Sequence, residues 1–299
     1  MAPTYPVLRW QVGDVRIARV VEIEGASPGS FFFAEATPER LLGHGWLRPH
    51  FLTTDGRVLA SIHAFVVESH GKAIVVDTCV GNDMPRDIKA WSMRRGRFLE
   101  DLAEAGYPRE RIDFVVCTHL HVDHVGWNTC LDGGRWVPTF PNARYLIGRR
   151  EWAYWAAETG ADKVVRDDSV RPVIEAGLAD LVEADHAITP EVRLEPTPGH
   201  TPGHVSVRIV SRGAEAVITG DLMHHPVQCA EPGWASRFDA DPEAARATRR
   251  AFLQQHRDGN VLVLGTHFAA PTAGYVRSAA GATGTTGAIG VTGACRFET

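Results

Sequence analysis

The sequence lacks several features that mark whole classes of protein. It has no run of lysine or arginine, and its formal net charge is -5 at pH 7, so we do not expect a nucleic-acid partner. No apolar run approaches the length of a membrane span. Residues 1–6 have neither a basic nor an apolar segment, so we expect no signal peptide. These absences predict a cytoplasmic protein that does not bind membranes.

Cysteine is also scarce. The chain has 5 cysteines in 299 residues, an odd number scattered along its length. They are Cys79, Cys117, Cys130, Cys229 and Cys295. This pattern is typical of reduced thiols rather than a disulfide framework. With 44% hydrophobic and 22% charged residues the composition is that of a globular enzyme, and we predict a single domain over residues 1–299.

Against this background, one short segment concentrates metal-binding side chains. Four such side chains occupy six positions in the run Thr118-His119-Leu120-His121-Val122-Asp123-His124. The run directly follows the apolar residues 114–117, which predict a buried strand. Imidazole and carboxylate are ligands of zinc and similar ions. A strand that opens into a tight loop would aim these side chains at one point, so the segment predicts a metal site.

The same chemistry recurs at three later positions, each beside a predicted strand. His200 lies in a turn-rich Pro-Gly-His loop before the strand 205–210. Asp221 follows the strand 216–219, and His267 follows the apolar run 261–264. The four places together predict one site assembled from strand ends.

In this order, the motifs His119-x-His121-x-Asp123-His124, His200, Asp221 and His267 resemble those of the metallo-β-lactamase superfamily. The resemblance covers most of the chain. It implies an α/β fold, the αββα four-layer sandwich, with the ligands at one edge of the sheets. It also implies two divalent metal ions. His119, His121 and His200 would hold the first ion, Asp123, His124 and His267 would hold the second, and Asp221 would bridge the two. Zinc is the expected metal, and manganese, cobalt and iron are also allowed because the set contains no cysteine.

The resemblance also implies a hydrolytic mechanism. Two ions that share a hydroxide would attack a carbonyl or phosphoryl centre. Asp123 would orient the hydroxide and pass on its proton. Asp77 matches a buried aspartate of the family that holds a ligand imidazole by a hydrogen bond. His224 stands where related lactonases carry a tyrosine near the substrate carbonyl. There it could donate to an oxyanion or protonate a leaving group while lying outside the metal ligands.

The expected substrate is a small ester-like molecule, either a lactone or another carboxylic ester. One alternative is an organophosphate triester or another xenobiotic, including hydrolytic dehalogenation. A mononuclear iron dioxygenase of the same fold and a purely structural metal site also stay open. Nothing in the sequence decides the oligomeric state, and a homodimer is allowed.

The remaining sequence predicts a mixed α/β chain. We expect strands at 15–23, 61–68, 73–77 and 144–147, and helices at 95–105, 149–159, 170–176 and 242–255. Asp241 should cap the last helix and Pro242 should begin it. Residues 28–49 form an aromatic loop with Phe31, Phe32 and Phe33. This loop could line a substrate pocket, form a dimer contact or fold onto the core. Residues 278–293 are rich in Gly, Ala and Thr and resemble a flexible extension.

Overall fold

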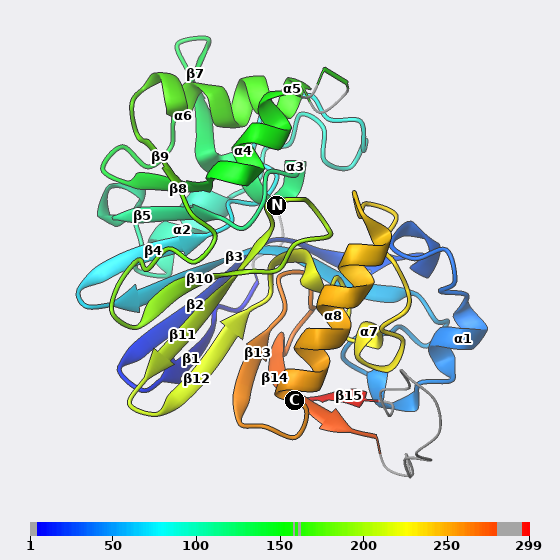
Figure 1. Ribbon diagram of the computed structural model, residues 1–299. Coiled ribbons are helices and arrows are strands. Elements are labelled where there is room, and N and C mark those ends of the chain that lie inside the picture. The colour runs from blue at the N-terminus through cyan, green and yellow to red at the C-terminus, as the bar shows by residue number, and fades with distance from the viewer. Residues whose placement is uncertain (1–4, 158, 161–162, 280–294) are drawn as a thin grey trace.

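Two β-sheets pack face to face and carry helices on their outer faces (Figure 1). The computed structural model describes residues 5–157, 159–160, 163–279 and 295–299. The layers run helix, sheet, sheet, helix, which confirms the αββα sandwich. None of the helices in the described ranges has the length and apolar character needed to cross a bilayer.

The first sheet has seven strands in the order β1-β2-β3-β4-β5-β8-β9. Their bounds are β1 Leu8–Val12, β2 Val15–Ser27, β3 Val58–Ser69, β4 Lys72–Val76, β5 Phe114–Cys117, β8 Arg144–Gly148 and β9 Ala179–Val182. Strands β1 to β4 are antiparallel, and β4, β5, β8 and β9 run parallel. Its outer face packs against α2 (Phe98–Glu104), α4 (Arg149–Ala156) and α6 (Arg171–Glu175).

The second sheet has six strands in chain order. They are β10 Val192–Pro196, β11 Val205–Ser211, β12 Ala214–Ile218, β13 Val261–Leu264, β14 Ala273–Ser278 and β15 Cys295–Glu298. Only β12 and β13 pair in parallel within the described residues. The outer face of this sheet packs against α8 (Pro242–His256). As predicted, Asp241 caps α8 by accepting from the Ala244 amide, and Pro242 begins it.

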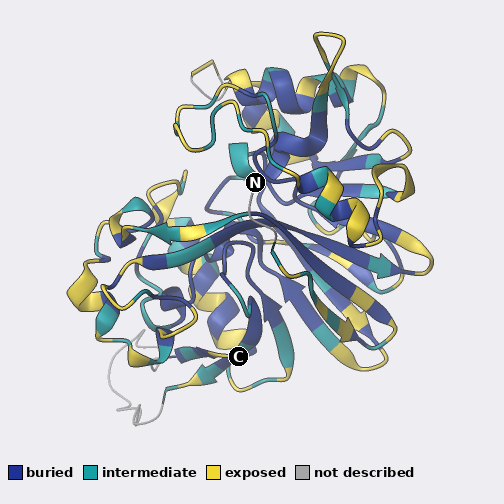
Figure 2. Ribbon diagram, turned by 180° about the vertical axis from the view of Figure 1, so that it is seen from behind, coloured by how far each residue is buried: buried dark blue, intermediate teal, exposed yellow. Residues whose placement is uncertain are grey.

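One of the hydrophobic cores lies between the sheets and follows from strand alternation. On β11, Val205, Val207 and Ile209 are buried and join a cluster with Phe65 and Val67 of β3. Burying one such side chain contributes about 1.5–3 kcal/mol, so this interface holds the two sheets together. Figure 2 shows the strands buried along most of their length and the exposed residues gathered in turns and outer loops.

Several predicted boundaries shift in the structure. The helix expected at 95–105 begins only at Phe98. The one expected at 170–176 is preceded by a π-helical turn, Arg166–Val170. That turn buries Asp168 against Arg86, a contact distant in sequence that periodicity does not reveal.

The remaining elements are short. The aromatic loop contains the 3-10 turns Gly29–Phe31 and Gly45–Leu47 and the helix α1 (Pro38–Leu42). Strands β6 (Thr129–Asp132) and β7 (Arg135–Pro138) form a separate hairpin. The other helices are α3 (Val122–Val125), α5 (Lys163–Val165) and α7 (Val227–Ala230). Of the expected tail at 278–293, residues 280–293 lie outside the described ranges.

Candidate metal centre

The histidine loop is fixed from behind by Asp77. Strand β5 ends at Cys117 and the chain turns into α3. The buried carboxylate of Asp77 accepts from the amide of Thr118 at 2.8 Å and from its hydroxyl at 2.9 Å. It also lies 2.9 Å from Nδ1 of His124. Because the carboxylate holds Nδ1, His124 presents Nε2 to the site, which is the role that the sequence predicted for Asp77.

Three imidazoles converge in a first donor group. Nδ1 of His121 lies 3.0 Å from Nε2 of His119 and 2.8 Å from Nε2 of His200. His200 comes from the loop between β10 and β11, far from the other two in sequence. Nitrogens bound to one zinc ion at about 2.0–2.1 Å lie roughly 3–3.5 Å from one another. The group therefore has the spacing of a metal site.

A second donor group lies beside the first. Nε2 of His124 and Nε2 of His267 are 3.3 Å apart. The carboxylate of Asp123 lies 3.7 Å from the former nitrogen and 3.6 Å from the latter. Asp123 is on α3, and His267 follows the end of β13. These three residues can hold a second ion.

Asp221 lies between the two groups. Its Oδ2 is 3.3 Å from Nε2 of His124 and 3.3 Å from Nε2 of His200. Its Oδ1 is 3.1 Å from Nε2 of His267. One carboxylate thus reaches donors of both groups, as a bridging ligand must. All seven ligand residues expected from the sequence are brought together.

The turn that delivers Asp221 requires glycine. Gly220 has φ 55°, and a Cβ there would come within 2.6 Å of Nε2 of His204. That nitrogen accepts the backbone amide of Asp221 at 2.8 Å. His204 therefore supports the turn, and the structure places it as a neighbour rather than a member of the donor groups.

The charges around the site suit a cation. Burial lowers the pKa of His119, His121 and His200, so their imidazoles stay neutral with a free lone pair. Burial also opposes charge on His124, yet the carboxylates of Asp221 and Asp77 raise its pKa above the usual value. Burial alone would raise the pKa of Asp221, but the surrounding histidines lower it, so this carboxylate stays ionised.

Three supporting residues had no signal in the sequence. Oδ1 of Asp239 lies 2.9 Å from Nδ1 of His200, and the carbonyl of Ser61 lies 3.0 Å from Nδ1 of His267. Both contacts leave Nε2 of the imidazole free for the site. Glu151 accepts from the amides of Leu120 and Gly203 at 3.1 and 3.0 Å, which joins the histidine loop to the His200 loop.

Two observations at the site indicate that its residues fit a metal ion. Oδ1 of Asp221 is buried and makes no hydrogen bond with any described residue. A buried ionised carboxylate is costly, and a cation among the donors would stabilise it. Five ring nitrogens, those of His119, His121, His124, His200 and His267, face one another or Asp221 at 2.8 to 3.8 Å. Nitrogen and oxygen donors of this kind suit zinc and related divalent ions.

The structure places His224 closer to the donor groups than the sequence suggested. Its Nε2 lies 3.2 Å from Oδ2 of Asp221. His200, Asp221 and His224 form a further set of atoms all within 4.8 Å of one another. Its neighbour His225 turns elsewhere, with Nε2 2.9 Å from the carbonyl of Phe51. The two histidines thus have separate surroundings.

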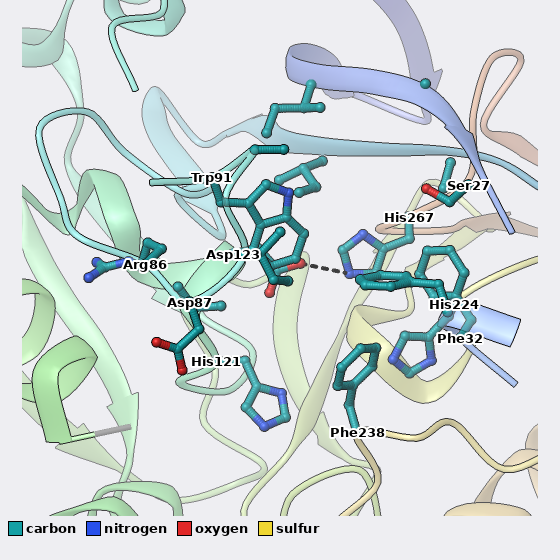
Figure 3. A pocket seen from close by; sticks show the side chains of 18 of the residues that line it. Ser27, Phe32, Arg86, Asp87, Trp91, His121, Asp123, His224, Phe238 and His267 are labelled. Carbon is teal, nitrogen blue, oxygen red and sulfur yellow. Dashed lines mark ion pairs between the residues drawn. The ribbon is translucent and has the colours of Figure 1, made fainter. Parts of the chain in front are cut away.

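Part of each donor group lines a pocket of about 840 Å³ (Figure 3). His121, Asp123, Asp221, His224 and His267 line it from the metal side. The walls are largely apolar and include Phe31, Phe32, Trp91 and Phe238 from segments distant in sequence. Such a pocket suits a small molecule with an apolar part.

The aromatic loop divides between the pocket and the core. Phe31 and Phe32 line the pocket, and the ring centroids of Phe31 and Phe238 lie 5.4 Å apart. Phe33 is fully buried and packs on Trp234 at 5.9 Å. The loop therefore does two of the three things that the sequence allowed: it lines the pocket and folds onto the core.

Curated relatives include lactonases. The chain is 31% identical over 123 residues to an N-acyl homoserine lactonase of Bacillus cereus, covering 41% of this chain and 42% of that protein. It is 26% identical over 179 residues to the N-acyl homoserine lactonase of Bacillus thuringiensis, covering 55% of this chain and 65% of that protein. The matched stretches thus span less than two thirds of these relatives.

Solved structures share the fold over almost the whole chain. The crystal structure of hydrolase AbOPH, described as in the beta lactamase superfamily, superposes with a TM-score of 0.76 at 24% identity, covering 98% of this chain and 96% of that one. The dizinc quorum-quenching lactonase AidC superposes with a TM-score of 0.74 at 20% identity, covering 92% and 95%. The model of the metallo-beta-lactamase superfamily matches residues 57–267. The chain belongs to the metallo-β-lactamase superfamily.

Proposed function

We propose that this protein is a metal-dependent hydrolase that uses two divalent ions, with zinc the expected metal, to cleave a lactone or another carboxylic ester. The observation that carries the proposal is the position of Asp221 between two donor groups that partly line an apolar pocket. A structural zinc site is closed by four ligands. Here four of the seven donor residues, His121, Asp123, Asp221 and His267, line a pocket that a substrate can enter.

The pocket favours an uncharged substrate. Among its described lining residues, Arg86 is the only lysine or arginine, and its guanidinium pairs with Asp168 at 2.6 Å. Asp87, Asp123 and Asp221 add carboxylates to the same pocket. With this guanidinium neutralised, the described part of the lining offers no free lysine or arginine to a carboxylate group of a substrate. Neutral esters with an apolar substituent match this lining.

The residues of the site would have different roles in hydrolysis. Bound ions would supply an activated water and polarise the substrate oxygen. His119, His121 and His200 would hold one ion, Asp123, His124 and His267 the other, and Asp221 both. Asp123 also lines the pocket, so its carboxylate can take the proton of the attacking water and deliver it to the leaving oxygen. His224 has two available roles: donor to the substrate oxygen, as the sequence predicts, or metal ligand.

The test combines metal analysis with a substrate panel. Protein purified without chelator should carry close to two equivalents of transition metal, and His121→Ala should lose metal and activity together. The panel contains lactones, aryl esters, phosphotriesters and thioesters, with chelator-treated protein as the control. Metal-dependent cleavage of lactones or aryl esters supports the proposal. Turnover confined to phosphotriesters favours the organophosphate alternative. A single equivalent that added zinc or manganese does not change contradicts the two-ion centre and favours the dioxygenase alternative.

A further inference from the structure

His224 is a buried imidazole with no hydrogen-bond partner on its ring. Only 1% of the residue is exposed. Its backbone amide donates to Oε1 of Gln228 at 2.8 Å, but neither ring nitrogen makes a hydrogen bond with any described residue. A buried polar group without a partner is unfavourable, and each such case requires an explanation. Nε2 of His224 lies 3.2 Å from the Asp221 carboxylate without a hydrogen bond to it, so an ion held between the two residues would give both a partner.

Aromatic neighbours hold the ring in place. Its centroid lies 6.2 Å from that of Phe32 and 6.3 Å from that of Phe33. The ring of His267 stacks on it at 5.8 Å with an interplanar angle of 14°. These contacts fix the orientation of the ring, so packing determines where its nitrogens lie.

The Nε2 atom has the surroundings of a metal ligand. It lies 3.2 Å from Oδ2 of Asp221, which is itself 3.3 Å from Nε2 of His200. Donor atoms that share one zinc ion at about 2.0–2.2 Å lie roughly 3–3.5 Å apart. Both distances to Oδ2 of Asp221 fit this spacing, and ligand atoms of the three residues lie within 4.8 Å of one another. These atoms lie on the side of the Asp221 carboxylate that faces His200.

A role as donor to the substrate fits less well. Although His224 lines the pocket, both ring nitrogens are buried. A donor to a substrate oxygen needs a nitrogen that reaches the open part of the pocket. An ion lying among His200, Asp221 and His224 would reach the buried Nε2 without any movement of the ring.

We propose that His224 is a metal ligand, which shares with His200 and Asp221 the ion held on the His200 side of the centre. This inference rests on the proposed function, because it requires bound metal. The chain would then have one donor more than the set expected from its motifs. Among the described residues, none makes a hydrogen bond to Nδ1 of His224, whereas Asp239 holds Nδ1 of His200, so His224 is the less constrained ligand of the two.

The test measures metal binding rather than turnover. Metal-free protein is titrated with zinc against a chromophoric chelator, and separately with cobalt while its visible absorption is recorded. His224→Phe keeps an aromatic ring among Phe32, Phe33 and Phe238 but removes both nitrogens. We expect this variant to lower the affinity for one of the ions by at least 10-fold, about the smallest effect seen for groups that only support a ligand. We also expect the cobalt spectrum to change. Phe238→Leu removes a ring from the same pocket wall without removing a donor and should bind metal like the wild type.

The outcomes separate this inference from the proposed function. If the wild type binds two ions and His224→Phe binds both with unchanged affinity, His224 is not a ligand and the role as substrate donor returns. If the wild type binds no transition metal, the proposed function fails first. A crystal structure of the zinc-loaded wild type tests the contact without any variant. An ion about 2.0–2.1 Å from Nε2 supports the assignment. An ion that is too far from Nε2 to be coordinated by it overturns the assignment.

Discussion

Nδ1 of His200 lies 2.9 Å from Oδ1 of Asp239, and the other oxygen of this carboxylate accepts the amide of Ser236 at 2.8 Å. The carboxylate is fully buried and has the guanidinium of Arg249 at 3.8 Å. The orientation of one expected ligand thus depends on a loop that follows Asp221 and on helix α8. Contacts of this kind set both the tautomer and the direction of a ligating imidazole.

Asp239→Asn tests this contact. The amide can no longer offer the same negative acceptor to Nδ1 of His200, so zinc affinity should fall about 10- to 100-fold. Competition titration against a chelator measures the change. Asp241→Ala, two positions away, removes the cap of α8 and should cost about 1 kcal/mol of stability while zinc affinity stays unchanged. Equal zinc affinity in Asp239→Asn and the wild type would show that the contact is dispensable.

Asp221→Ala tests the bridging position. Its carboxylate reaches donors of both groups, so its loss should disturb the placement of two ions relative to each other. Turnover should fall by more than about 100-fold, the scale for removing one group that acts on transition-state charge. The affinity for the ion among His119, His121 and His200 should fall far less. Near-native turnover with both ions present would rule out the bridge.

His225 predicts a pH dependence of stability in the metal-free protein. Burial lowers its pKa to about 4, although the Phe51 carbonyl acts in the opposite direction. The unfolded chain has the usual pKa of about 6.5. Between these values the unfolded state binds a proton that the folded state does not. The stability that the neutral imidazole provides is therefore complete above pH 6.5 and is lost as the pH falls towards 4.

The measurement compares His225→Gln with the wild type by denaturant unfolding at several pH values. One group contributes a slope of about 1.4 kcal/mol per pH unit between pH 6.5 and 4. The variant should lack this contribution, so the stability difference between the two proteins should shrink on acidification. A difference that stays constant over this range would contradict a buried neutral His225.

Glu151→Gln tests the link between the two histidine loops. The carboxylate accepts four hydrogen bonds, from Leu120, Trp155, Thr201 and Gly203. An amide has one acceptor oxygen, so at least one buried donor loses its partner at a cost of about 1–3 kcal/mol. Urea unfolding measures the loss. Glu183→Gln breaks an exposed pair with Arg149 and should change stability by less than about 1 kcal/mol; a similar effect in both variants would refute the link.

Trp91→Ala tests the pocket wall. The indole lines the pocket, and its centroid lies 6.5 Å from that of Phe31. Removing it should raise KM about 10-fold for esters with a long apolar or aryl substituent, the equivalent of 1.4 kcal/mol of lost contact. Esters with a small substituent should change little. Met93→Ala, on the same loop but 57% exposed, is the matched control.

The sequence was most informative where a ligand directly follows a strand. His119, Asp221 and His267 could be predicted because each comes within a few residues of the end of β5, β12 or β13. The neighbouring ends of strands in a packed sandwich lie at the same edge, so side chains after them meet. Helix α8 could be predicted for a similar local reason, since Asp241 and Pro242 mark its start in the sequence itself.

Other parts of the site depend on contacts that no local pattern encodes. Ser61 reaches His267 because β3 meets the segment after β13 through the bridge between Ala60 and Phe268. Asp239 stands in an irregular loop, where nothing distinguishes it from a surface aspartate. His224 could be noticed from its distance to Asp221, but the burial of its nitrogens depends on three phenylalanines from two other segments. The positions and burial of these groups depend on packing between segments that are distant in sequence.

The donors of each group come from both halves of the chain, and this order affects when metal can be acquired. His119 and His121 precede His200 by some eighty residues, and the second group lacks a member until His267 has been made. During synthesis on the ribosome, the first donor group is incomplete until His200 has been made, and the second until His267 has been made. An ion at the second group would therefore bind only after the segment that contains His267 has been made. At this group the choice between zinc and competing ions would then depend on the folded site and on the metals available to it, rather than on an early nascent peptide.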